Sequence, residues 1–122
     1  MEQGDGNTTV GHLKAAVRRF VRDREWERFH TPRNLAESIC IESAELLEIF
    51  QWASEHEDPV AEDTEVRERI EEELSDVLVY CISLANAAEI DIARAVLSKT
   101  KKNEEKYPIE KYRGTYVKPR KI

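Results

Sequence analysis

Two pairs of acidic residues have the spacing that places carboxylates on one side of a helix. Glu42 and Glu45 stand three residues apart, and so do Glu73 and Asp76. Residues three apart in an α-helix are surface neighbours, with Cβ atoms about 5–6 Å from each other. Each pair is therefore a bidentate carboxylate patch if the chain around it is helical.

Glu42 stands in an apolar stripe and not on a polar face. At about 100° per residue, it lies in the middle of one side of its helix. The apolar residues of that side are Leu35, Ile39, Leu46, Ile49 and Phe50. A buried carboxylate without a partner is costly, so it is normally protonated, paired or bound to a metal ion. The position of Glu42 thus indicates a cation or a polar partner.

The second pair has a similar place on the next helix. Glu73 lies near the edge of an apolar stripe, with Asp76 and Tyr80 further round on the same side. Consecutive helices usually pack antiparallel, which lets the two acidic edges face each other. Four converging carboxylates would raise one another's pKa values unless a cation neutralised them. All-oxygen ligation favours Mg²⁺, with Mn²⁺ as the alternative, over zinc.

Two interpretations without catalysis stay open at this point. The chain has 25 acidic residues, and closely spaced glutamates usually form a solvated helix face. The protein could then be a helical interaction module whose acids are surface charge, and only the position of Glu42 argues against this. It could also be a metal-responsive regulator that binds nucleotides without turning them over.

Four helices would position these acids. Helical apolar spacing predicts them over residues 10–25, 32–54, 63–88 and 91–106, with the polar residues 55–62 as the linker inside the domain. The expected N-caps are Thr8 or Thr9, then Thr31 followed by Pro32, and Asp91. With only four glycines and four prolines in 122 residues, an all-α single domain over 1–122 is expected. Residues 1–9 and 109–122 are expected to be flexible tails, the second extended on the surface.

Composition excludes several classes of function. The net charge of −6 argues against a nucleic acid polymer as partner. Neither a signal peptide nor an apolar run long enough for a bilayer is found, which predicts a cytoplasmic protein without a membrane partner. Cys40 and Cys81 lack the spacing of a zinc or redox site and are expected to be packed thiols.

At the acidic pairs the sequence resembles the MazG-like all-α nucleoside triphosphate pyrophosphohydrolase superfamily. The signature of that family is E-x-x-E followed by E-x-x-D, which here is Glu42, Glu45, Glu73 and Asp76, separated by residues 46–72. The sequence is most similar to the dCTP pyrophosphatase branch. The blocks DREWERFHTPRNL, ESAELLEIFQW, EELSDVLVY and AVLSKTKKNEEKYP carry this resemblance and cover most of residues 20–108.

The resemblance implies a four-helix MazG-like bundle that associates into a dimer, or a tetramer made of two dimers, with neighbouring chains completing each pocket. It implies hydrolysis of a nucleoside triphosphate to monophosphate and pyrophosphate, with Mg²⁺ held by the four acids. The expected substrate is dCTP or a modified dCTP, and the role is sanitation of the nucleotide pool. A dUTP-type or broad-specificity enzyme is the alternative. Either Glu45 or Glu48 would orient or deprotonate the attacking water.

The resemblance also implies a substrate site formed by Trp26, Trp52, Tyr80, Lys99 and Asn103. The tryptophans would flank the base and the tyrosine would lie beside the sugar. The lysine would contact phosphate, and the asparagine would hydrogen-bond phosphate or sugar. Val17 stands where some relatives carry a histidine, a departure that concerns the preferred base and not the hydrolysis.

Overall fold

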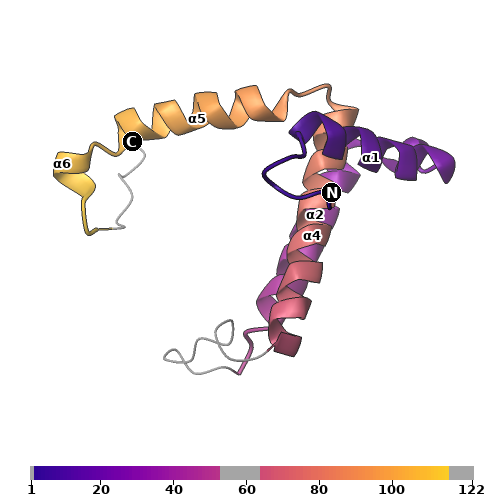
Figure 1. The fold of residues 1–122 in the computed structure, drawn as a ribbon, viewed down its shortest axis with the longest axis horizontal. Coiled ribbons are helices and arrows are strands. Elements are labelled where there is room, and N and C mark those ends of the chain that lie inside the picture. The colour runs from indigo at the N-terminus through magenta and orange to yellow at the C-terminus, as the bar shows by residue number, and fades with distance from the viewer. Residues whose placement is uncertain (1, 53–63, 116–122) are drawn as a thin grey trace. The chain divides into compact units, whose positions relative to one another are not determined.

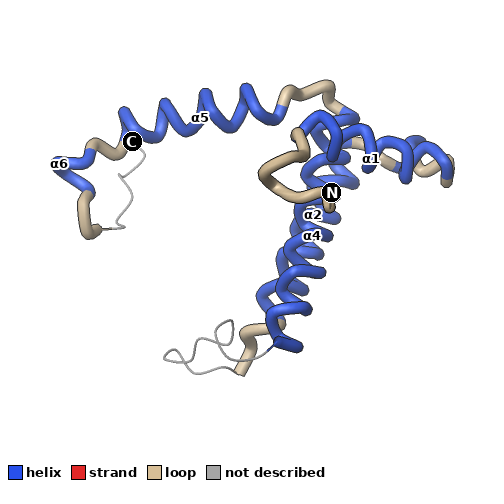
Figure 2. The backbone as a smooth tube through the Cα atoms, in the orientation of Figure 1, coloured by secondary structure: helices blue, strands red, loops and turns tan. Residues whose placement is uncertain are grey.

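The described chain is built from helices. The structure is a computed structural model that describes residues 2–52 and 64–115, and the expected all-α class is confirmed because these residues contain no strand (Figure 2). The elements are α1 (Val10–Asp23), the 3₁₀-helix η1 (Glu27–Phe29), α2 (Pro32–Glu48), α4 (Thr64–Ala87), α5 (Ile92–Lys106) and α6 (Ile109–Tyr112). They belong to two compact units, Met1–Ile90 and Asp91–Ile122. The expectation of a single domain stays a prediction.

Side-chain caps start three of the helices at the residues that the sequence predicts. Thr9, Thr31 and Asp91 each accept a hydrogen bond from the backbone N–H three residues further on, at 3.0, 3.2 and 2.8 Å. Each of these bonds satisfies one N–H that the first helical turn leaves unpaired. Of the two candidates before α1, Thr9 is the cap. Pro32 follows Thr31 at the first turn of α2, as expected.

In the first unit, α2 and α4 run side by side in opposite directions (Figure 1). The antiparallel packing expected for these helices is therefore confirmed. Leu35 of α2 is 1% exposed, and Val21 and Ala85 are also buried. Burial of such apolar side chains is the main source of stability in a unit of this kind. This packing fixes which face of α2 meets α4.

Three hydrogen bonds donated by side chains hold α1 against the C-terminal end of α4. The Nζ of Lys14 donates to the carbonyl of Ile90 at 2.7 Å. Arg18 donates to the Oδ1 of Asn86 at 3.1 Å, and the Nδ2 of Asn86 donates to the carbonyl of Lys14 at 3.1 Å. The three bonds fix the position of α1 on α4.

The end predicted for the second helix is wrong. α2 ends at Glu48, and the amides of Ile49, Phe50 and Gln51 bond to carbonyls three residues back, at 3.3, 3.0 and 3.2 Å. Such bonds tighten the chain into 3₁₀-type turns. Trp52 then adopts a positive φ of 72°, which an α-helix cannot contain. Residues 53 and 54 of the predicted helix, and the predicted linker, lie outside the described residues.

Two smaller expectations also fail. Residues 109–112 form α6 and are not extended; Pro108 precedes this helix, and the rings of Tyr107 and Tyr112 meet edge to face at 5.2 Å. Residues 116–122 lie outside the described part.

The prediction of a packed thiol is wrong for Cys40. This residue is exposed, and only Cys81 is half-buried. Among the described helices, none is both long and apolar enough to cross a membrane.

Candidate metal centre

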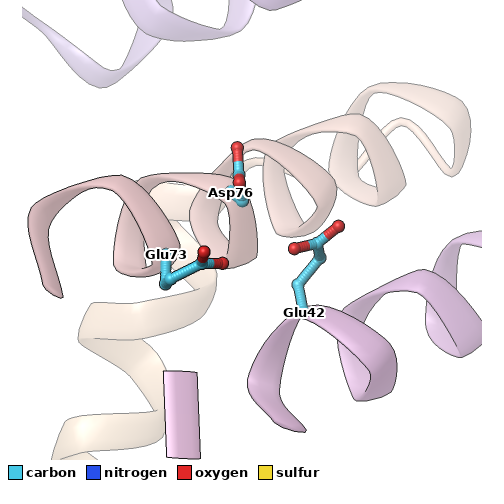
Figure 3. A group of neighbouring side chains, drawn as sticks. All are labelled: Glu42, Glu73 and Asp76. Carbon is cyan, nitrogen blue, oxygen red and sulfur yellow. The ribbon is translucent and has the colours of Figure 1, made fainter. Parts of the chain in front are cut away.

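Three of the four signature acids meet between α2 and α4. Glu42 comes from α2, whereas Glu73 and Asp76 come from consecutive turns of α4 (Figure 3). Each residue offers a carboxylate oxygen, and these oxygens all lie within 4.8 Å of one another. The antiparallel pairing of the two helices produces this convergence, because it turns the two acidic edges toward each other. We call these three residues the carboxylate cluster.

Two oxygens of the carboxylate cluster are buried without a partner. Oε2 of Glu42 and Oε2 of Glu73 accept no hydrogen bond from any described residue. A buried acceptor of this kind loses its hydrogen bonds to water and forms none with the protein. The cost in free energy is largest when the acceptor is charged. A cation at the centre of the cluster would supply the missing interaction. The buried oxygens therefore fit a metal site better than a solvated helix face.

The surroundings of the cluster disfavour its negative charge. Burial raises the pKa of the Glu42 carboxyl, and a hydrogen bond with Glu45 together with the charges of Glu45, Asp76 and Glu73 raises it further. Burial likewise raises the pKa of Glu73, followed by a hydrogen bond with Glu45 and the charges of Glu45, Asp76 and Glu72. Glu45, although exposed, thus lies beside both acids. Glu45 as a metal ligand stays a prediction.

The donor set of this site is entirely carboxylate oxygen, which suits a hard divalent cation. Arginine side chains of the first unit form the ion pairs Arg22–Glu27, Arg33–Glu37 and Arg67–Glu71. None of them places a basic side chain on the cluster. Glu42, Glu73 and Asp76 are therefore the residues that could hold a metal ion, with Glu45 beside them.

A model of the MazG-like family matches residues 37–118, a range that contains both acidic pairs. This chain belongs to the MazG-like family. It is 40% identical over 111 residues to dCTP pyrophosphatase 1 of Rattus norvegicus, and 41% identical over 102 residues to dCTP pyrophosphatase 1 of Homo sapiens. These matches cover 90% and 82% of this chain but 65% and 59% of the relatives, so it spans less than two thirds of their length.

A crystal structure of a pyrophosphatase from Archaeoglobus fulgidus has a similar fold. Its TM-score is 0.72 at 42% sequence identity, and the match covers 88% of this chain and 98% of that one. The expected MazG-like all-α architecture is therefore confirmed by a relative solved independently of this chain.

Within this MazG-like site, Glu48 lies apart from the carboxylate cluster. It is the last residue of α2, six positions after Glu42, which turns it about 120° away around the helix. Glu48 is exposed. Of the two acids predicted to act on the water, Glu45 is beside the cluster and Glu48 is not brought to it.

Tyr80 and the two tryptophans occupy different parts of the first unit. Tyr80 is half-buried one turn after Asp76 on the same face of α4. Trp26 precedes α2 and meets Phe20 edge to face at 5.7 Å. Trp52 follows α2 and is 92% exposed. The 17 residues of α2, which span about 25 Å, stand between the two tryptophans in the chain, and their common contact with a base stays a prediction.

Lys99 and Asn103 belong to the second unit. Both are on α5, one turn apart and therefore on one face, with Lys99 exposed and Asn103 half-buried. Their contact with substrate stays a prediction.

Sequence reasoning missed a pocket in the first unit of this MazG-like chain. A cavity of about 240 Å³ lies between α1, η1 and α4, and Ser83 lines it. The available signal was a polar residue among the apolar positions of α4, seven residues after Asp76.

Proposed function

We propose that this MazG-like protein is a Mg²⁺-dependent nucleoside triphosphate pyrophosphohydrolase that produces a monophosphate and pyrophosphate. The observation that carries the proposal is the carboxylate cluster with its two buried, unpartnered oxygens. We further propose dCTP or a modified dCTP as the substrate, in the service of nucleotide-pool sanitation. The support is the name dCTP pyrophosphatase 1 carried by relatives about 40% identical to this chain.

Each acid has a part in this reaction. Glu42, Glu73 and Asp76 would hold the cation, and Mg²⁺ when bound would supply positive charge for the phosphates and acidify the attacking water. Glu45 is exposed beside Glu42 and Glu73, where it can orient that water and accept its proton. The water oxygen would bond to the α-phosphorus as the anhydride bond to the β-phosphate breaks, so that the monophosphate forms and pyrophosphate leaves. Lys99 would bind phosphate as a point charge, with Asn103 hydrogen-bonding beside it.

We also propose that the protein works as a homo-oligomer, a dimer or a tetramer of two dimers. The large apolar side chains of Ile41, Leu47 and Leu78 are exposed on α2 and α4, which favours a further partner for this helix pair. A single species of monomer mass in light scattering at micromolar concentration would contradict the proposed oligomer.

The location that we propose is the cytoplasm, without membrane or nucleic acid polymer as partner. The net charge of −6 supports the exclusion of nucleic acid, because phosphate backbones are bound by clustered basic residues.

The experiment that tests the enzymatic proposal measures pyrophosphate release from all common nucleoside and deoxynucleoside triphosphates. Each substrate is assayed with Mg²⁺, with Mn²⁺ and with EDTA. We expect release that requires metal and is fastest with dCTP or a modified dCTP. Fastest release from dUTP, or equal release from all bases, would overturn the base assignment alone. Absence of metal-dependent release from every triphosphate would overturn the enzymatic proposal.

A further inference from the structure

The chain passes from the first unit to the second through a short loop between α4 and α5 (Figure 2). α4 ends at Ala87 and α5 begins at Ile92. We call residues 88–91 between them the joint. Because Lys99 lies on α5, the conformation of the joint determines which points this side chain can reach.

The backbone of the joint is left-handed at Glu89. Its φ is 55°, in the region where glycine is the usual residue and a side chain is unfavourable. The amide of Ile90 donates to the carbonyl of Ala85 at 2.9 Å, a bond typical of helices that end in a left-handed residue. Residues in such conformations persist when the surrounding structure holds them. Contacts from a neighbouring element should therefore help to maintain the joint.

Lys14 of α1 makes such a contact. Its Nζ donates to the carbonyl of Ile90 at 2.7 Å, and its own carbonyl accepts from the Nδ2 of Asn86 at 3.1 Å. Lys14 is half-buried, and a hydrogen bond donated by an ammonium group is stronger than one between neutral groups. A positive charge is also favourable near the C-terminus of a helix. The two bonds join Lys14 both to the last turn of α4 and to the joint.

Neighbouring basic side chains of α1 have different contacts. Arg22 pairs with Glu27 of η1, and Arg18 donates to the side chain of Asn86 within α4. The ammonium group of Lys14 instead bonds to the backbone of the joint. Its removal should therefore loosen the joint, while the bonds of Asn86 keep α1 on α4.

We propose that Lys14 is a positioning residue, which restrains the joint and so places Lys99 of α5 for its contact with the triphosphate. The placement of Lys99 rests on the proposed function, whereas the restraint of the joint does not. Positioning of this kind matters for the rate, because a displacement of about 1 Å can cost about a hundredfold.

The first test measures the joint without any substrate. Lys14→Met removes the ammonium group and keeps a side chain of similar length. Arg19→Met is the control, because it removes the same charge from an exposed position of α1. In amide hydrogen exchange followed by NMR, Lys14→Met should speed exchange of the Ile90 amide about tenfold and leave the central turns of α4 unchanged. Equal exchange of this amide in the two variants would overturn the proposal.

The second test separates positioning from a general loss of structure. Lys14→Met should raise KM for the preferred triphosphate about fivefold and keep the thermal shift that Mg²⁺ gives the native protein. Lys14→Arg, which keeps a charged donor, should recover most of the native KM. Arg19→Met should have the native KM. If Lys14→Met has the same KM as Arg19→Met, Lys14 does not position a residue that binds the substrate.

A double-mutant cycle tests whether Lys14 acts through Lys99. In a Lys99→Gln background, Lys14→Met should change KM less than about twofold, because the contact that it positions is already lost. A fivefold effect in both backgrounds would show that Lys14 does not act through Lys99 and would overturn this part of the proposal. If the native protein releases no pyrophosphate, the proposed function fails, and the exchange of the Ile90 amide still decides whether Lys14 restrains the joint.

Discussion

Glu42 and Glu73 should make the stability of the protein depend on pH, and on metal if they bind it as we propose. Burial and neighbouring acids raise the pKa of both carboxyls above the ordinary value of 4.5. Between that value and the raised pKa, the folded protein holds protons that the unfolded chain has released. The free energy of unfolding contributed by these groups therefore falls as pH rises through this interval, and the loss is complete above the raised pKa. A bound cation counteracts this loss by mass action.

A charge-neutral variant should therefore stabilise the metal-free protein. In EDTA at neutral pH, Glu42→Gln should melt a few degrees above the native protein, because an uncharged amide replaces a disfavoured carboxylate. The control is Glu68→Gln, which removes the same charge from an exposed position on α4. The native protein should also lose stability as the pH rises above the ordinary glutamate value of 4.5, with a flatter profile for Glu42→Gln. Parallel profiles measured by urea unfolding would contradict the pKa assignment.

At the scale of single residues, the sequence predicted a functional role only where a residue type conflicts with the helical pattern around it. Glu42 was found because a charge inside an apolar stripe conflicts with its neighbours. The burial of Ser83 was not predicted, because a serine on a helix is common and only the tertiary structure shows that its hydroxyl is buried without a partner among the described residues. The separation of Glu48 from the cluster was not predicted. It depends on which face of α2 meets α4, and the sequence does not show this for position 48.

At the scale of elements, helix starts were predictable because caps are local hydrogen bonds. Thr31 with Pro32, and Asp91, were assigned from residue type alone and are the caps of α2 and α5. Helix ends were less predictable. The end of α2 follows from 3₁₀-type hydrogen bonds and from the positive φ of Trp52, neither of which leaves a specific residue signal. α6 was missed for a similar reason, since a single turn has too few residues for a periodic pattern.

The choice between Thr8 and Thr9 gives a matched test of capping. Thr9→Ala removes the acceptor for the His12 amide and should lower the free energy of unfolding by about 1 kcal/mol. Thr8 bonds only to the side chain of Asn7, so Thr8→Ala should cost much less. Equal losses for the two variants in denaturant unfolding would show that the hydrogen bond of Thr9 does not stabilise α1.

At the scale of the whole molecule, the chain consists of two compact units, Met1–Ile90 and Asp91–Ile122. The acids of the first unit were predictable because their meeting requires only one antiparallel helix pair. The substrate contacts of Lys99 and Asn103 on α5 rest on the family resemblance alone and stay predictions, because they depend on contacts between distant parts of the chain or between chains. Such contacts involve many weak interactions and leave no short pattern in the sequence.

Lys99 offers a test of whether the second unit takes part in catalysis. Lys99→Gln should raise KM for the triphosphate about tenfold, because a positive contact to phosphate is lost. It should not change the thermal shift caused by Mg²⁺ alone, since the metal would be held by the first unit. Lys101→Gln, which removes the same charge from another exposed face of α5, is the control. Equal KM values for the two variants in steady-state kinetics would exclude the phosphate contact.

The measurement that tests the central claim most directly is metal-dependent pyrophosphate release from dCTP by Glu42→Gln and Asp76→Asn, with Glu68→Gln as the matched control. Each substitution removes one negative charge and keeps the size of the side chain. We predict that the first two variants lose about a hundredfold or more of kcat/KM while retaining native helical content, because each loses a ligand that holds the cation. The control should keep native activity. If both cluster variants remain within about twofold of the control, the carboxylate cluster is not the catalytic metal centre.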